Sequence, residues 1–169
     1  MACITFAITA LIGLYFISLR GLALLPIGLL GLFLLFAYTP WLTRSPILCL
    51  IAPGLGFGPL MVLSTHIALT GSFSLTAFVA SLVPFFLVSD LLLLNQFPDV
   101  DADRNGGRRT MPVIFGYATS SYIYALFLVL AATALIAPAL TGLTPMLTLV
   151  SLIALLPALK SLQGARNYQ

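Results

Sequence analysis

Long runs of apolar residues, separated by short polar segments, dominate the chain. They occupy residues 2–19, 22–38, 47–69, 75–95, 114–137 and 146–160. Most are roughly 17–25 residues long, the length that an α-helix needs to cross the hydrocarbon core of a bilayer. The runs are continuous, whereas the strands of a membrane β-barrel alternate between apolar and polar positions. The pattern therefore predicts an all-α, polytopic bundle of about six transmembrane helices.

Composition indicates a lipid-embedded protein rather than a soluble one. Hydrophobic residues make up 61% of the chain and charged residues 7%, whereas about 25% charged residues is usual in a soluble domain. We therefore expect residues 1–169 to form a single membrane domain. The basic residues lie in separate loops and do not form the patch that binds nucleic acid. Cys3 and Cys49 lie in apolar runs and are expected to be small buried residues.

The distribution of basic residues predicts how the chain lies in the membrane. One side would carry nearly all of them: Arg44, Arg104, Arg108, Arg109, Lys160 and Arg166. The turns at 70–74 and 139–145 carry no charge and would lie on the other side, and only Arg20 departs from the pattern. Since Lys and Arg concentrate in cytoplasmic loops, we expect a multi-pass protein of the cell membrane whose acidic loop faces the cytoplasm.

That acidic loop, residues 95–110, concentrates the charge of the chain. It holds three of the four acidic residues and three of the seven basic ones. Pro98 suits the first position of a helix, and the glycines at 106–107 suit its end, so a short helix is predicted over 98–105. In such a helix Asp99 and Asp103 lie one turn apart, on one face.

Two carboxylates in this arrangement suit a magnesium ion. Mg²⁺ takes one or two carboxylates and fills its other positions with water and substrate phosphates. Arg108 and Arg109 could hold phosphate oxygens by forked hydrogen bonds. Asn95, one turn before Asp99, could add an amide group. The spacing is thus typical of a Mg²⁺-diphosphate site at a membrane surface, although a solvated loop of mutually neutralising charges explains it as well.

The order of these residues resembles a known motif. Asn95-x-x-x-Asp99-x-x-x-Asp103, followed by Gly107-Arg108-Arg109-Thr110-x-Pro112-Val113-x-x-Gly116, is similar to the second aspartate-rich motif of the UbiA superfamily of intramembrane prenyltransferases. Gly58-Pro59-Leu60, with Thr70-Gly71 after it, resembles the preceding helix in the branch that makes menaquinone-type quinones. Tyr38-Thr39-Pro40 resembles the Tyr-rich loop of the family. The resemblance implies an all-α fold of about nine membrane helices.

The resemblance also implies an activity and residue roles. Family members transfer a prenyl group from a polyprenyl diphosphate to an aromatic or quinone-precursor acceptor, such as 1,4-dihydroxy-2-naphthoate or 4-hydroxybenzoate, and use Mg²⁺. Asp99 and Asp103 would hold the metal with support from Asn95. The diphosphate would be bound by Arg108, which replaces the usual Lys, and by Arg109, Arg44 and Tyr38. The Tyr38 ring could also stabilise an allylic carbocation.

The chain departs from the family pattern in one respect. It has no N-D-x-x-D-x-x-x-D string, and its first apolar run resembles the third helix of the family. We therefore expect it to correspond to the later part of the nine-helix fold. A truncated gene product, a mis-called start, or a split enzyme whose companion chain supplies the missing motif would each explain this.

The sequence can be compared with two other function classes. A CDP-alcohol phosphotransferase needs a D-G-x-x-A-R element, which Asp103-Arg104-Asn105-Gly106 does not provide. A non-catalytic remnant or a small channel or carrier is the second alternative. Intramembrane polar residues are typical of a carrier, and Asp90, expected to face a cavity or a partner, fits that description. Mg²⁺-dependent binding of a prenyl diphosphate would separate a prenyltransferase from a channel or carrier.

Overall fold

The computed structural model describes residues 2–166, with side chains from Ile4 onward, and this part of the chain is helical without strands. All six predicted helices are present. They are α1 (Ala2–Arg20), α2 (Leu24–Tyr38), a third helix made of α3 (Pro46–Leu55), η2 (Gly56–Leu60) and α4 (Met61–Thr70), then α5 (Leu75–Asn95), α7 (Met111–Leu140), and a sixth made of η3 (Met146–Leu155) and α8 (Leu156–Arg166). Two short helices, η1 (Leu42–Arg44) and α6 (Val100–Asn105), lie in the loops.

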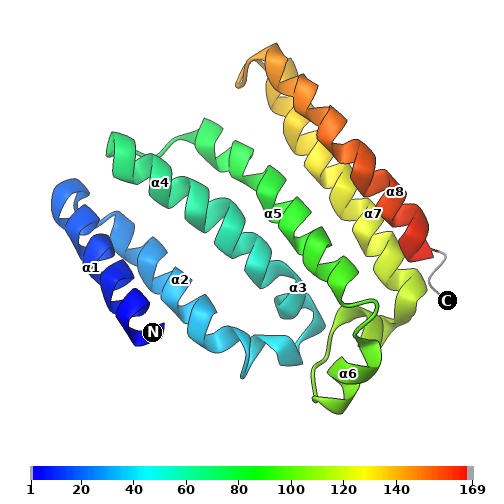
Figure 1. The fold of residues 1–169 in the computed structure, drawn as a ribbon. Helices are drawn as coiled ribbons and strands as arrows, with labels where there is room; N and C mark the ends of the chain where they lie inside the picture. The colour runs from blue at the N-terminus through cyan, green and yellow to red at the C-terminus, as the bar shows by residue number, and fades with distance from the viewer. Residues whose placement is uncertain (1, 167–169) are drawn as a thin grey trace.

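The helices pack mainly against their neighbours in the sequence. Figure 1 shows them side by side, with α1 and α8 at opposite edges and α5 between α3 and α7. The largest buried cluster joins these central helices to α8, through Leu50, Leu93, Tyr124, Leu128 and Ala165. The middle of the arrangement, around α5, is therefore its most tightly packed part.

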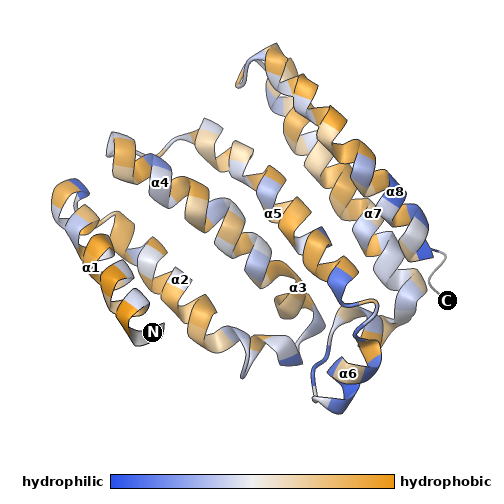
Figure 2. Cartoon of the chain, viewed as in Figure 1, coloured by the Kyte–Doolittle hydropathy of each residue, from blue (hydrophilic) through white to orange (hydrophobic). Residues whose placement is uncertain are grey.

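The apolar surface is that of an integral membrane protein. Four helical spans in the described residues are long and apolar enough to cross a bilayer: Pro46–Thr70, Leu75–Asn95, Met111–Leu140 and Met146–Arg166. The helices α1 and α2 are apolar but shorter. Figure 2 shows apolar residues along the length of these helices and polar residues near α6. Because the apolar side chains remain exposed along the helices, lipid is the solvent that they fit.

The third predicted helix is continuous but distorted at its Gly/Pro cluster. Residues Gly56–Leu60 form one turn of π-helix, with Pro59 inside it. A Cβ atom on Gly58 would lie 2.6 Å from the Ser81 carbonyl oxygen, and one on Gly54 would lie 2.5 Å from the Phe85 carbonyl oxygen. The cluster thus both distorts the helix and lets it lie directly against the backbone of α5.

The fifth predicted helix begins three residues earlier than expected and is not continuous. It starts at Met111, and the backbone breaks at Gly116, where φ is 77° and ψ is 172°. This positive φ is sterically open to glycine and costly for other residues. The break separates a short first segment from the long membrane-spanning part of α7, which periodicity alone does not reveal.

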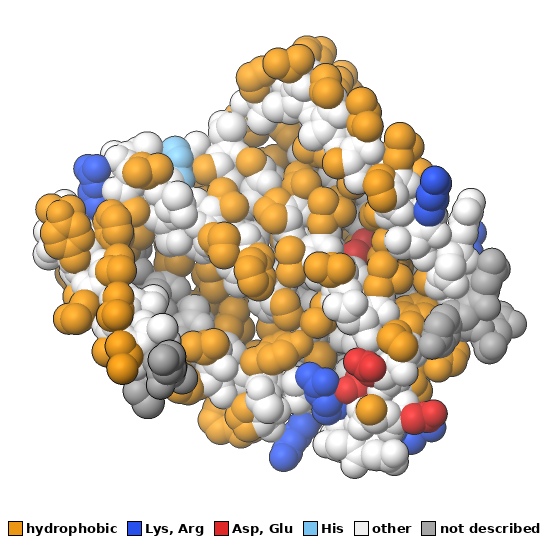
Figure 3. All heavy atoms as spheres, viewed as in Figure 1, with side chains coloured by type: hydrophobic (Ala, Val, Ile, Leu, Met, Phe, Trp, Pro, Cys, Tyr) orange, Lys and Arg blue, Asp and Glu red, His pale blue; other side chains and the backbone are white. Residues whose placement is uncertain are grey.

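The two ends of the arrangement differ in charge. The turns after α4 and after α7 lie at one end, and η1 and α6 lie at the other (Figure 1). On the face shown in Figure 3, acidic and basic side chains gather toward the α6 end, while most of the face is apolar. The segregation expected from the sequence, with uncharged turns opposite the charged loop, is therefore present.

Candidate functional site

Two loops that are far apart in the sequence meet at the charged end. The first contains η1 and follows α2; the second runs from Gln96 to Thr110. The Arg109 backbone N–H donates to the Thr43 carbonyl oxygen at 2.9 Å, which ties the second loop to the first. The Thr43 hydroxyl in turn donates to the Thr39 carbonyl oxygen at 2.8 Å. The predicted diphosphate-binding residues of both loops are thereby brought to the same place.

The short helix α6 is present but begins later than predicted. It spans Val100–Asn105, and Asp99 precedes it with φ −94° and ψ 8°, which is not helical. Pro98 is therefore not its first residue, because the chain is still turning through 96–99 when it passes the proline. The Asp103 N–H donates to the Asp99 carbonyl oxygen at 2.7 Å, so these residues do lie one turn apart.

The predicted metal ligands occupy different environments. Asp103 is buried, with 4% of its surface exposed, and Asp99 is exposed. The Arg108 guanidinium donates to the Asp103 carboxylate, Nη1 to Oδ1, at 2.9 Å. Sequence spacing treats the two aspartates alike, whereas in the structure one is a surface residue and the other is half of an ion pair.

The remaining predicted site residues lie at the helix ends and in the two loops at the same end of the molecule. Arg44 is the last residue of η1 and Asn95 is the last residue of α5, and both are exposed, as is Arg109. Tyr38 ends α2 and is half-buried, with its hydroxyl 3.7 Å from the Cys49 sulfur. Arg108 and Asp103 both lie close enough to interact electrostatically with the Tyr38 hydroxyl.

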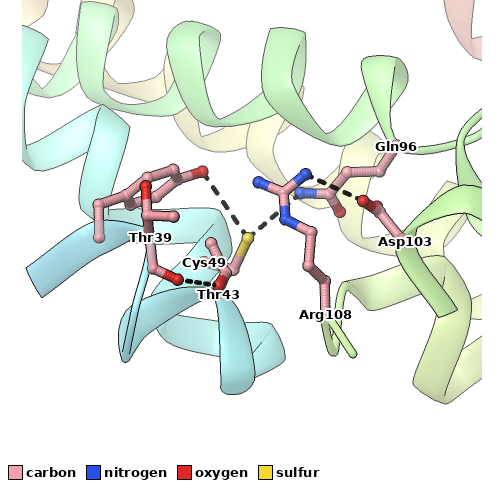
Figure 4. A network of polar contacts seen from close by, with 7 residues as sticks. Thr39, Thr43, Cys49, Gln96, Asp103 and Arg108 are labelled. Atoms are coloured by element: carbon pink, nitrogen blue, oxygen red, sulfur yellow. Dashed lines mark hydrogen bonds and ion pairs between the residues drawn. The ribbon is translucent and has the colours of Figure 1, made fainter. Parts of the chain in front are cut away.

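Two neighbouring residues were not singled out by their chemistry in the sequence. Gln96 is buried and its Nε2 group donates to the Cys49 sulfur at 3.7 Å. Figure 4 shows the Arg108 guanidinium between the Cys49 thiol and the Asp103 carboxylate, with the Gln96 amide beside it. Cys49 is buried as expected, while the Cys3 side chain lies outside the described residues. The sequence signal that could have identified Gln96 is its position, because it is a polar residue directly after a membrane helix.

Unused hydrogen-bonding groups are also present near this site. Gln96 Oε1 and Thr110 Oγ1 are buried and have no hydrogen-bond partner among the described residues. A buried polar atom without a partner is costly, so such atoms often mark a place where a ligand or water binds. The site therefore has spare donor and acceptor capacity in addition to its charges.

The donor types of these residues are those that a magnesium ion uses when water and phosphate supply its other ligands. The described residues contain no group of three or more His, Cys, Asp or Glu side chains that could enclose a metal by themselves. Asp99 and Asp103 supply hard carboxylate oxygens one turn apart, and Gln96 Oε1 is a further unpartnered oxygen. Mg²⁺ commonly uses one or two carboxylates and takes its other ligands from water and phosphate.

Asp101 and Arg104 form a solvated ion pair in the same loop. Their side chains are 3.7 Å apart and largely exposed, at 94% and 62% respectively. An exposed pair of this kind contributes about 0–1 kcal/mol to stability. This pair differs from Asp103 and Arg108 in its burial and its distance, although all four residues belong to one loop.

Asp90, the acidic residue inside α5, lies away from this loop. It is buried, and neither carboxylate oxygen has a hydrogen-bond partner among the described residues. The apolar cavity between α5, α7 and η3 is lined by residues such as Val83, Pro84 and Leu135, and Asp90 is not among them. Asp90 is therefore a buried residue of α5, close enough to Tyr124 of α7 to interact with it electrostatically.

Comparison with known proteins identifies the family. The model of the UbiA prenyltransferase family matches residues 1–169. One relative is the 1,4-dihydroxy-2-naphthoate octaprenyltransferase of Bacillus subtilis (strain 168), which is 24% identical over 148 residues, covering 84% of this chain and 46% of the relative. The chain thus spans less than half the length of that relative, and no solved structure matches it significantly. Since the family model matches the whole chain, the protein belongs to the UbiA prenyltransferase family.

Proposed function

We propose that the protein takes part in the transfer of a prenyl group from a polyprenyl diphosphate to an aromatic or quinone-precursor acceptor, in a Mg²⁺-dependent reaction. The observation that carries this proposal is the meeting of two loops at the charged end. The hydrogen bond from the Arg109 backbone N–H to the Thr43 carbonyl oxygen joins the loop that carries the arginines and aspartates to the loop that contains Arg44. Such a convergence of cationic groups and carboxylates suits a metal-diphosphate ligand.

In this proposal each residue has a defined role. Asp99 and Asp103 hold Mg²⁺, which, when bound, neutralises charge on the diphosphate as it leaves. Arg108, Arg109 and Arg44 donate hydrogen bonds to phosphate oxygens, and guanidinium groups suit these oxygens because they can donate two parallel bonds.

Tyr38 and the surrounding apolar residues act on the other end of the substrate. Tyr38 presents an aromatic ring, whose face attracts a positive charge on the allylic carbon. The apolar helices exclude water, which would otherwise capture an allylic cation. The acceptor class is proposed from the name of the Bacillus subtilis relative, which acts on 1,4-dihydroxy-2-naphthoate.

We further propose that a companion segment completes the site. The chain spans less than half the length of its relative, and the sequence contains no N-D-x-x-D-x-x-x-D motif. A second acidic motif, supplied by another segment or chain, would provide the remaining carboxylates. Ligand binding, which does not require turnover, is therefore the property to measure on this chain.

The test is the binding of a non-hydrolysable farnesyl thiodiphosphate to the purified chain in lipid nanodiscs. Trp41, the single Trp, lies exposed in the loop that contains η1 and gives a fluorescence readout. We expect binding with Mg²⁺ and its loss in EDTA. Asp99→Asn and Asp103→Asn should each weaken binding by about tenfold or more, as expected for the loss of a charged contact.

Asp101→Asn is the matched control, because it removes the same charge from the same loop at an exposed position, where the carboxylate is paired only with Arg104. Its binding should equal that of the unaltered chain. Binding that does not depend on Mg²⁺, or equal losses in all three variants, would favour a non-catalytic remnant or a channel or carrier over a prenyltransferase.

A further inference from the structure

The ion pair between Arg108 and Asp103 affects how a cation and a diphosphate would bind at the site. The Asp103 carboxylate is the more buried of the two proposed metal ligands, and it is already neutralised by Arg108 at 2.9 Å. A divalent cation that approaches the Asp103 carboxylate would find the Arg108 guanidinium already bound to it. Since like charges at contact distance repel strongly at a poorly hydrated position, the cation and Arg108 compete for the same carboxylate.

The backbone holds Arg108 in position for this contact. Gly107 adopts a positive φ of 71°, which turns the chain sharply after α6. The Arg108 N–H then donates to the Asp103 carbonyl oxygen at 2.9 Å, and the next N–H, that of Arg109, donates to Thr43. The ion pair is thus set by the fold of the loop, in contrast to the exposed contact between Arg104 and Asp101 at 3.7 Å.

The two partners differ in their freedom to move. The Asp103 side chain is 5% exposed, whereas the Arg108 side chain is 45% exposed. The carboxylate is therefore fixed, and the guanidinium can turn toward the exposed side of the loop without unfolding the backbone that carries it. An anion arriving from that side could take over the hydrogen bonds of Arg108 and leave Asp103 free.

We propose that Arg108 is an internal counter-ion for Asp103, and that the site accepts a divalent cation together with a diphosphate rather than the free cation. This inference rests on the proposed function. The diphosphate oxygens accept the Arg108 hydrogen bonds, and Asp103 exchanges the guanidinium for the cation. The Asp103 carboxylate is thus paired with a positive charge before and after the exchange.

The test measures binding of Mn²⁺, the paramagnetic probe, to the full chain in nanodiscs by electron paramagnetic resonance, with and without inorganic pyrophosphate. We expect the unaltered chain to bind Mn²⁺ weakly alone and more tightly with pyrophosphate. Arg108→Gln should tighten the binding of Mn²⁺ alone by about five- to fiftyfold, within the usual range for coupled sites. The same variant should bind pyrophosphate more weakly.

Arg104→Gln is the matched control, because it removes one positive charge from the same loop without freeing a buried carboxylate. Its affinity for Mn²⁺ alone should stay within about twofold of the unaltered chain, as expected for a solvated pair. Equal tightening in both variants would mean that general electrostatics, not the Asp103 pair, controls the metal, and would overturn the inference. Asp103→Asn, combined with Arg108→Gln, should abolish the gain.

The outcomes also separate this inference from the proposed function. If the unaltered chain binds Mn²⁺ and pyrophosphate, but Arg108→Gln leaves the affinity for Mn²⁺ alone unchanged, the counter-ion role is wrong and the diphosphate site stands. If neither probe binds under any condition, the proposed function itself fails, and the inference fails with it.

Discussion

Two glycines in the third membrane helix show how single residues determine the packing around α5. Gly54 and Gly58 are four residues apart and face α5, in the small-xxx-small pattern that lets membrane helices approach closely. A methyl group at Gly58 would lie 2.6 Å from the Ser81 carbonyl oxygen, which belongs to the backbone and cannot simply rotate away. The close contact of α3 and η2 with α5 therefore depends on the absence of a side chain at these positions.

We predict that Gly58→Ala lowers the free energy of unfolding by about 1–3 kcal/mol, the usual cost of overpacking. Gly56→Ala is the control, because nothing lies within 4 Å of its Cβ position. The measurement is reversible unfolding of both variants in mixed detergent micelles. Equal stabilities for the two variants would contradict the close contact between η2 and α5.

The candidate site shows what residue patterns reveal and what they leave open. The spacing of Asp99 and Asp103 correctly placed the two residues one helical turn apart. It did not distinguish the exposed carboxylate from the buried one, because burial depends on the loop that folds over the helix. The partner of Asp103 was also not predicted, since Arg108 reaches it only through the turn at Gly107.

At the scale of elements, the contacts of Arg20 explain why this basic residue lies at the end opposite the other basic loops. It ends α1 at the uncharged end of the molecule, where its Nε and Nη2 groups donate to the carbonyl oxygens of Ala68 and Leu69 at 2.7 and 2.8 Å. These carbonyls belong to the last turn of α4, which has no helical N–H partners for them. Arg20 therefore caps a neighbouring helix, and its charge complements the dipole of that helix.

We predict that Arg20→Ala destabilises the C-terminal end of α4 by about 0.5–1 kcal/mol, the usual value of a cation at an exposed helix end. Hydrogen–deuterium exchange should become faster in residues 67–72 and stay unchanged in α7. Arg20→Lys should retain part of the effect, because it keeps the charge but loses the forked geometry. Unchanged exchange in Arg20→Ala would show that the cap is not formed in the membrane.

The break in α7 is a second feature at this scale. Gly116 matches the last glycine of the aspartate-rich motif, and the structure supplies a physical reason for a glycine at this point. With φ at 77° and ψ at 172°, the position is open to glycine and strained for any other residue. The break lets the start of α7, residues 111–115, continue from the loop that contains α6 in a different direction from the membrane-spanning part of the helix.

At the scale of the whole molecule, the helices lie in the order of the sequence and separate two unlike ends. The uncharged turns after α4 and α7 lie opposite the loop that contains α6 (Figure 1). Because basic residues are retained on the cytoplasmic side during insertion, we propose that the α6 end faces the cytoplasm. A diphosphate substrate is water-soluble at its charged end, and it would then be available on this side.

We predict that single cysteines at the two ends react from opposite sides of the membrane. Ser72→Cys lies in the exposed turn after α4, and Asn105→Cys lies at the exposed end of α6. A membrane-impermeant maleimide added to intact cells should label Ser72→Cys at once, and Asn105→Cys only after permeabilisation. The native cysteines are replaced by Ser in both variants to remove background labelling. The reverse pattern of labelling would invert the proposed orientation.

The sequence alone determined the helical class, the positions of the membrane segments and the residues of the acidic loop. It could do so because lipid acts on each apolar segment separately, so length and hydropathy decide where each helix forms. Only the tertiary structure decided that Arg109 meets Thr43, that Arg108 neutralises Asp103, and that Gln96 is buried beside Cys49. Two of these contacts join segments that are distant in sequence, and the contact of Arg108 with Asp103 depends on the turn at Gly107. A local sequence pattern does not determine how such segments pack together.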